Sequence, residues 1–162
     1  MINLRTTLVS GNLIFIALFS PVVCHTASHG TTVGKLEITQ AWIRATPPNA
    51  KNAGAFMIIS NHGTAADRLV AVSSEIANKT ELHNHINDEG VMRMREVSHI
   101  VIPAHSSTEL KPGSYHIMFK GLTKAIKEGD MVMINLKFEN AGITTLHTPI
   151  KKYKSGSKHK HN

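Results

Sequence analysis

Cysteine is almost absent from this chain of 162 residues, which contains Cys24 and no other. One cysteine cannot close an internal disulfide, so the folded part has to be stabilised by its apolar core alone. A reductase of the thioredoxin type is excluded, because it needs a Cys-x-x-Cys pair. A blue-copper electron-transfer centre is excluded as well, because its metal needs a thiolate from the folded domain and Cys24 lies in the amino-terminal segment.

Long apolar runs are also missing. The amino-terminal run at residues 13–19 is much shorter than the roughly 20 residues of a membrane-spanning helix, so no stable membrane insertion is expected. Arg5 precedes this run and Pro21 follows it, which is the pattern of a secretory signal peptide over residues 1–24. Cys24 would also allow lipid attachment, although Val23 directly before it disfavours that processing.

Recognisable catalytic motifs are absent from the sequence too. There is no glycine-rich phosphate loop, Gly-x-Ser-x-Gly elbow, HExxH helix or carboxylate pair suited to acid–base work, so no enzyme is expected. The formal net charge is +7, and five of the 18 basic residues lie within residues 151–162, which contain no acidic residue. Because an exported protein rarely meets nucleic acid, we interpret this segment as a solvated or metal-binding tail rather than a nucleic-acid site.

The chain does contain many short runs of period-two alternation that are separated by glycine, proline and other turn residues. Strands are expected at residues 36–43, 54–60, 68–74, 80–85, 91–96, 108–110, 116–119, 131–139 and 144–150. One short helical turn is expected near residues 122–126. This spacing favours an all-β sandwich or Greek-key barrel. The expected layout is a flexible segment at residues 25–34, one β domain at residues 35–150 and a disordered polar tail at residues 151–162.

Four residues with soft, neutral donor atoms follow the pattern H-x10-M-x21-H-x-M, namely His83, Met94, His116 and Met118. Imidazole nitrogen and thioether sulfur favour Cu(I). Zinc would favour thiolate, more imidazole or carboxylate, and calcium and magnesium need oxygen ligands. Because residues two apart on a strand share a face, His116 and Met118 should project together while Ile117 faces the core. These residue types therefore indicate a copper site.

Two neighbouring residues compete for the same roles. Met92 shares a strand face with Met94, and His85 shares one with His83, so spacing alone does not choose between the members of either pair. Methionine is more often a core residue than a ligand. Met57, which lies within an apolar run, is accordingly expected in the core.

Further donors lie towards the carboxyl end of the chain. Met131 and Met133 are expected on the polar face of their strand, as surface residues or as an auxiliary copper path. The tail contains His159 and His161, which could bind Cu(II) with help from His147 or from the amino-terminal His25 and His29. A plain solvated tail is the alternative, because a short histidine-rich tract is compositional evidence only.

The four-residue pattern resembles the signature of the periplasmic copper chaperones of the PCu(A)C type, which is H-x10-M-x21-H-x-M. The resemblance extends over about residues 35–150, nearly the whole expected domain. It is also carried by the flanking blocks AWIRATPP at 41–48, DRLV at 67–70, ELH at 81–83, GVMRMR at 90–95, LKPG at 110–113, GL at 121–122 and KEGD at 127–130.

This resemblance implies a cupredoxin-like Greek-key fold that lacks the cupredoxin cysteine. It implies that Cu(I) is bound by His83, Met94, His116 and Met118, with Met92 and His85 as neighbours of the site. Some members add a carboxyl extension rich in histidine and methionine that takes Cu(II). Here the chain has no methionine after Met133, which weakens the parallel.

The resemblance also implies a function. A periplasmic protein of this type hands copper on for assembly of the CuA centre of cytochrome c oxidase, so its partner would be a copper-receiving thiol protein or the CuA subunit itself. Two alternatives from other classes stay open. One is a periplasmic scavenging or resistance protein that buffers copper without delivery, and the other is a structural β-sandwich with fortuitous donor residues.

Overall fold

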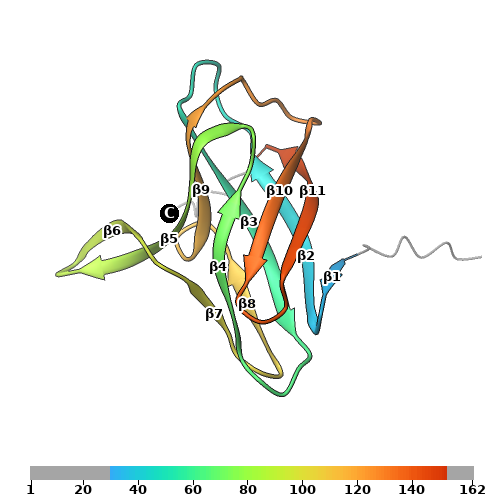
Figure 1. The fold of residues 1–162 in the computed structure, drawn as a ribbon. Helices are drawn as coiled ribbons and strands as arrows, with labels where there is room; N and C mark the ends of the chain where they lie inside the picture. Colours follow the sequence, from blue (N-terminus) through green and yellow to red (C-terminus); the bar gives the residue numbers. More distant parts are fainter. Residues whose placement is uncertain (1–29, 153–162) are drawn as a thin grey trace, which may run out of the picture.

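The structure is a computed structural model in which residues 30–152 are described (Figure 1). Outside these residues lie the expected signal peptide at residues 1–24 and the histidines His25, His29, His159 and His161. What is expected of them stays a prediction. No helix within residues 30–152 is long and apolar enough to cross a membrane.

Strands make up all the regular secondary structure of the described chain. They are β1 (Thr31–Val33), β2 (Leu36–Arg44), β3 (Asn52–Asn61), β4 (Asp67–Ser73), β5 (Ala77–Asp88), β6 (Val91–Glu96), β7 (Ile100–Ile102), β8 (Ser106–Leu110), β9 (His116–Leu122), β10 (Met131–Phe138) and β11 (Ile143–Lys151). Every strand expected from the alternation is present, and the expected all-β architecture is confirmed.

The strands follow one hydrogen-bonded path in the order β6-β5-β9-β3-β2-β11-β10-β4-β7, with β1 pairing β2 and β8 pairing β3. All pairs are antiparallel except β11 with β2. Figure 1 shows β4, β10 and β11 stacked over β2 and β3, while the hairpin of β5 and β6 extends sideways from this body. The chain thus forms a sandwich with one projecting hairpin.

Period-two alternation builds the core between the layers. In β10 the apolar residues from Val132 to Phe138 alternate with exposed positions, and the exposed ones include Met131 and Met133. Met57 is buried in β3. The placement of these three methionines agrees with the sequence prediction.

The expected helical turn at residues 122–126 is wrong, because the described chain contains no helix there. Leu122 ends β9 instead, and its backbone N–H donates to the carbonyl of Lys51 at 2.9 Å. The next N–H, that of Thr123, donates to the carbonyl of Ile76 at 2.9 Å. These two bonds tie the end of β9 to segments distant in sequence and continue the extended backbone through Leu122.

Two short strands were missed. Thr31–Val33 falls in the segment expected to be flexible, but it forms β1 and pairs with β2. Ile100–Ile102 forms β7, in which both isoleucines are fully buried against the core. A three-residue strand gives too little alternation to stand out in a sequence.

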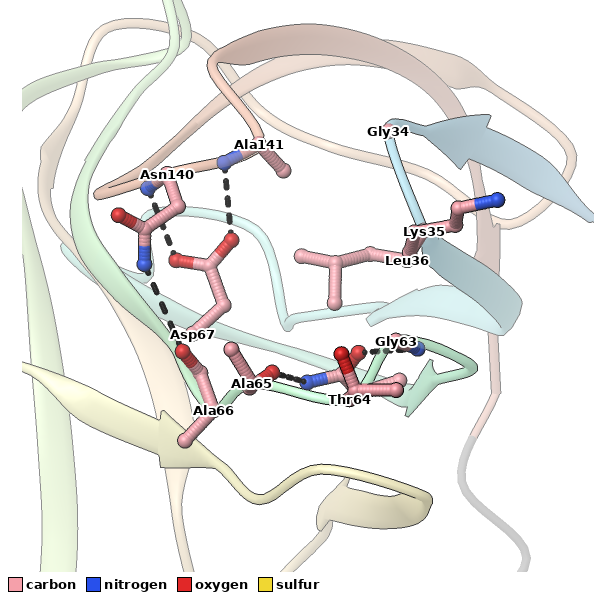
Figure 2. A pocket seen from close by; sticks show the side chains of 11 residues that line it. Gly34, Lys35, Leu36, Gly63, Thr64, Ala65, Ala66, Asp67, Asn140 and Ala141 are labelled. Atoms are coloured by element: carbon pink, nitrogen blue, oxygen red, sulfur yellow. Dashed lines mark hydrogen bonds between the residues drawn. The ribbon is translucent and has the colours of Figure 1, made fainter.

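Buried Asp67 ties β4 to the turn between β10 and β11. Its carboxylate accepts hydrogen bonds from the backbone N–H groups of Asn140 at 3.0 Å and Ala141 at 2.9 Å. Figure 2 shows this contact at the edge of a hollow that also contains Leu36 and Thr64. The hollow is lined by none of the predicted donor residues. We therefore assign Asp67 a structural role.

Candidate metal centre

The four residues of the H-x10-M-x21-H-x-M pattern lie on one face of the strands β6, β5 and β9, which are neighbours in that order. His83 of β5 lies directly opposite His116 of β9. On the other side of β5, His85 lies opposite Met94 of β6. Because directly opposed residues of antiparallel strands share a face, the three histidines and Met94 project from the same side.

His116 lies at the centre of this group. Its ring centroid is 5.7 Å from that of His83 and 5.1 Å from that of His85. Its Nε2 lies 3.3 Å from the Sδ of Met94. Two ligands of one ion, at metal–nitrogen and metal–sulfur distances of about 2.0 and 2.3 Å in a tetrahedral arrangement, lie about 3.5 Å apart. The spacing of these two atoms therefore fits a shared metal ion.

The tautomer of His116 follows from its other hydrogen bond. Nδ1 is 2.9 Å from the carbonyl oxygen of Ser114, which can only accept, so Nδ1 carries a proton. In the neutral ring Nε2 then has a lone pair, and that lone pair faces a thioether sulfur that has no proton to give. A cation between the two atoms would satisfy both.

Burial lowers the pKa of His116 below its ordinary value of 6.5. The hydrogen bond to the Ser114 carbonyl acts in the opposite direction, and the neighbouring His85 and His83 lower the pKa further. The neutral ring, which is the form that binds metals, is thereby favoured.

His83 is also buried, and its two ring nitrogens have different surroundings. Nε2 lies 2.6 Å from Oε2 of Glu81, and it donates because a carboxylate only accepts. Nδ1 is buried and has no hydrogen-bond partner. Leaving such an atom unpaired costs on the order of 1–3 kcal/mol. Nδ1 of His83 is therefore a second donor atom that a cation would satisfy.

Glu81 is a site residue that the sequence analysis missed. Its side chain is about 1% exposed, forms ion pairs with Lys79 and with Lys120 at 2.9 Å, and accepts a hydrogen bond from His83. The hydrogen bonds from Lys120, Lys79 and His83, in that order, outweigh burial and lower the pKa of Glu81 to about 2. The signal was available, because Glu81 is two residues before His83 and must share its face.

Met118 is two residues after His116 on β9 and shares its face. It stands opposite Glu81 of β5 on one side and opposite Gly54 of β3 on the other. His83 is its diagonal neighbour on β5, and such neighbours are about 7–8 Å apart, which a long side chain can reach. Ile117 between the two donor residues of β9 is fully buried, as predicted.

Of the other donors considered in the sequence, two lie on this face of the sheet and one does not. His85 belongs to the cluster, and its Nδ1 has only a long contact of 3.4 Å with the Ser114 carbonyl. Met92 shares the face of Met94 but is 58% exposed near the end of the hairpin. His147 is exposed on β11, which is separated from β9 by β3 and β2. His147 is therefore not part of this group.

Sulfur is needed to complete a metal centre on this face. Within residues 30–152 there is no group of three His, Cys, Asp or Glu side chains arranged to hold a metal ion. His83 and His116 are buried, whereas Met94 is 43% exposed. An ion held here would thus have nitrogen donors on the protein side and an accessible thioether towards solvent.

The comparisons with known proteins agree with this fold. The model of the family described as "Putative lipoprotein LpqE-like" matches residues 36–150. The "Putative lipoprotein Lxx21020" of Leifsonia xyli subsp. xyli (strain CTCB07) is 28% identical over 134 residues, which are 80% of each chain.

Two solved structures are similar over most of the described chain. The copper-bound PCuAC domain from PmoF2 is 25% identical, with a TM-score of 0.67, and covers 77% of this chain and 99% of its own. The apo PCuAC domain from PmoF1 is 26% identical, with a TM-score of 0.67, and covers 77% of this chain and all of its own. The expected cupredoxin-like fold is therefore confirmed.

Proposed function

The chain belongs to the LpqE-like family, and we propose that it is an exported copper chaperone that carries Cu(I) as cargo on the face of β5, β6 and β9. The PmoF2 domain, which shares the fold over most of the described chain, was solved in a copper-bound form. The protein is a carrier in this proposal, not an enzyme.

One observation carries the proposal. Nε2 of His116 and Sδ of Met94 are 3.3 Å apart, and the proton of His116 is held on the opposite side of its ring by Ser114. Two lone-pair donors of these types, facing each other without a proton, match the preference of Cu(I) for imidazole and thioether. An ordinary surface contact would not require this tautomer.

We propose His83, Met94, His116 and Met118 as the ligands. All four are neutral when they bind, so the ion keeps its single positive charge. The buried histidines would hold Cu(I), and the exposed sulfur of Met94 would give a partner access to it. Thiolates bind Cu(I) more strongly than thioethers do, so a receiving thiol protein would displace the methionines first. Delivery towards the CuA centre of cytochrome c oxidase is the proposed destination.

Anaerobic competition of the mature protein against a chromogenic Cu(I) chelator tests the binding. We expect one tightly bound Cu(I) per chain, and an affinity at least tenfold lower in the variants His83→Gln and Met118→Leu. His147→Gln and Met133→Leu are matched controls, because they change the same residue types on the far strands β10 and β11. Unchanged affinity in both site variants would contradict the proposed ligands.

The alternative function is a scavenger that buffers copper without delivery. A deletion strain separates the two, because loss of a chaperone lowers cytochrome c oxidase activity at limiting copper. Loss of a scavenger instead raises sensitivity to excess copper and leaves oxidase activity unchanged.

We also propose that the protein acts in the periplasm. Residues 1–24 have the pattern of a signal peptide, and the family description names lipoproteins. The mass of the mature protein distinguishes cleavage with a free amino terminus from acylation at Cys24, since acyl chains add a large, discrete mass. Full-length protein recovered from the cytoplasm would contradict export.

A further inference from the structure

Glu81 is a buried carboxylate that the proposed ligand set does not use. It lies on the same face as His83, next to Lys79 of β5 and Lys120 of β9, which are directly opposed to each other. Both lysines are about half exposed or more, whereas the carboxylate is about 1% exposed. A buried carboxylate is costly unless it is paired, and here two ammonium groups and one imidazole N–H pair it. This arrangement keeps a fixed acceptor next to His83.

We infer that Glu81 is a positioning residue for the metal: it holds His83 with the proton on Nε2, so that His83 binds the ion through Nδ1 whereas His116 binds it through Nε2. The inference rests on the proposed copper function. It assigns the two histidines opposite ring nitrogens, although they lie directly opposite each other on neighbouring strands.

The first support is the geometry of His83. The 2.6 Å contact between Nε2 and Glu81 Oε2 requires a proton on Nε2, because the carboxylate has none to give. The remaining nitrogen, Nδ1, is buried and unpaired. A ligating histidine commonly donates its second N–H to a carboxylate, which fixes the ring and makes it a stronger donor. The orphaned Nδ1 is therefore the atom left for the ion.

The second support is the pairing of Glu81. Lys79 and Lys120 form ion pairs with its buried carboxylate, Lys120 at 2.9 Å, and so hold the acceptor in place next to His83. His116 has an uncharged acceptor instead, the carbonyl of Ser114, which takes the proton of Nδ1.

Ring-nitrogen NMR of the 15N-labelled mature protein tests the inference before any metal is added. Two-bond correlations between ring protons and ring nitrogens identify the tautomer of each histidine, and the variants His83→Gln and His116→Gln assign the signals. We expect Nε2–H for His83 and Nδ1–H for His116. A proton on Nδ1 of His83 would overturn the inference.

Anaerobic addition of Cu(I), which is diamagnetic, completes the test. We expect the Nδ1 signal of His83 and the Nε2 signal of His116 to shift, while the protonated nitrogens stay protonated. A shift of Nε2 of His83 would overturn the inference but leave the copper function intact. If the apo tautomers were as expected and Cu(I) moved neither histidine, the proposed function itself would fail, and the metal role of Glu81 with it.

Substitutions separate positioning from a purely structural role. Glu81→Gln keeps an acceptor oxygen, so it should keep the tautomer and most of the Cu(I) affinity. Glu81→Ala removes the acceptor, so His83 should populate both tautomers and Cu(I) affinity should fall roughly 10–100-fold, as for other residues behind metal ligands. Glu96→Gln is the matched control, because Glu96 also stands opposite His83 but is exposed.

The outcomes of these variants are distinguishable. If Glu81→Ala lowered stability but left the His83 tautomer and the Cu(I) affinity unchanged, Glu81 would be structural and the inference would be wrong. If Glu81→Ala failed to fold, the NMR of the unaltered protein and of Glu81→Gln would still decide, because both report the tautomer directly.

Discussion

Met94 and His116 meet although their strands are not neighbours in the sheet. β6 and β9 flank β5, and the sulfur and the ring nitrogen reach each other above it with a separation of 3.3 Å. Met94 is therefore the donor whose position depends most on the projecting hairpin of β5 and β6 (Figure 1). Its partner His116 is anchored in the body of the sandwich.

Met94→Leu should weaken Cu(I) binding at least tenfold, because leucine keeps the shape and apolar character of methionine but has no sulfur donor. Met92→Leu should change the affinity less than threefold, because Met92 lies further out on the hairpin opposite Asn87. Chelator competition on both variants measures the difference. The opposite order of effects would assign the ligand role to Met92.

Cu(I) affinity should decrease as the pH falls from 7.5 to 5.5. Protons compete with the ion for imidazole nitrogen, so binding is lost as the histidines become protonated. Burial lowers the pKa of His116, so its own share of this loss should occur below pH 6.5. Competition titrations at the two pH values provide the measurement, and equal affinities would contradict imidazole ligation.

The apo protein should lose stability in acid in a way that depends on Glu81. The pKa of Glu81 is lowered from 4.5 to about 2, so its contribution is fully present above pH 4.5 and is lost as the pH falls from 4.5 towards 2. A difference of one bound proton between the unfolded and folded protein changes the free energy of unfolding by at most about 1.4 kcal/mol per pH unit. Urea unfolding at pH 5 and pH 3 should show a smaller decrease in the free energy of unfolding for Glu81→Gln than for the unaltered protein. Glu96→Gln, an exposed control, should keep the full decrease.

Ile117→Ala should destabilise the apo protein by about 2–5 kcal/mol, because the side chain is fully buried and its removal leaves a cavity beneath His116 and Met118. Ile143→Ala is the matched control, since Ile143 is 67% exposed and should cost little. The midpoints of urea unfolding compare the two. Equal losses of stability in the two variants would mean that burial of Ile117 behind the donor residues does not stabilise the domain.

The alternation of the sequence was enough to predict the nine longer strands and the side to which their residues point. Ile117 in the core and Met133 at the surface follow from period two, whereas Met57 was expected in the core because it lies within an apolar run. The length of β5 could not be predicted in the same way. The polar residues of Asn87-Asp88 resemble a turn, but backbone pairing with β6 continues the strand to Asp88.

Side-chain partners were harder to predict than strands. Nothing in the sequence says that β9 lies beside β5, so the pairing of His83 with His116 depends on the resemblance or on the structure. Glu81 could have been placed on the face of His83 from its spacing alone. Its burial between Lys79 and Lys120 could not, because Lys120 comes from β9, whose register is a tertiary property.

X-ray absorption at the copper edge of the Cu(I)-loaded mature protein is the most direct test of the central claim. The unaltered protein should show mixed nitrogen and sulfur scattering, and this mixture should persist when residues 153–162 are removed. The double variant Met94→Leu/Met118→Leu should lose the sulfur scattering, whereas Met131→Leu/Met133→Leu, two exposed methionines of β10, should keep it. Sulfur scattering that survives in the first variant, or disappears in the second, would place the copper elsewhere.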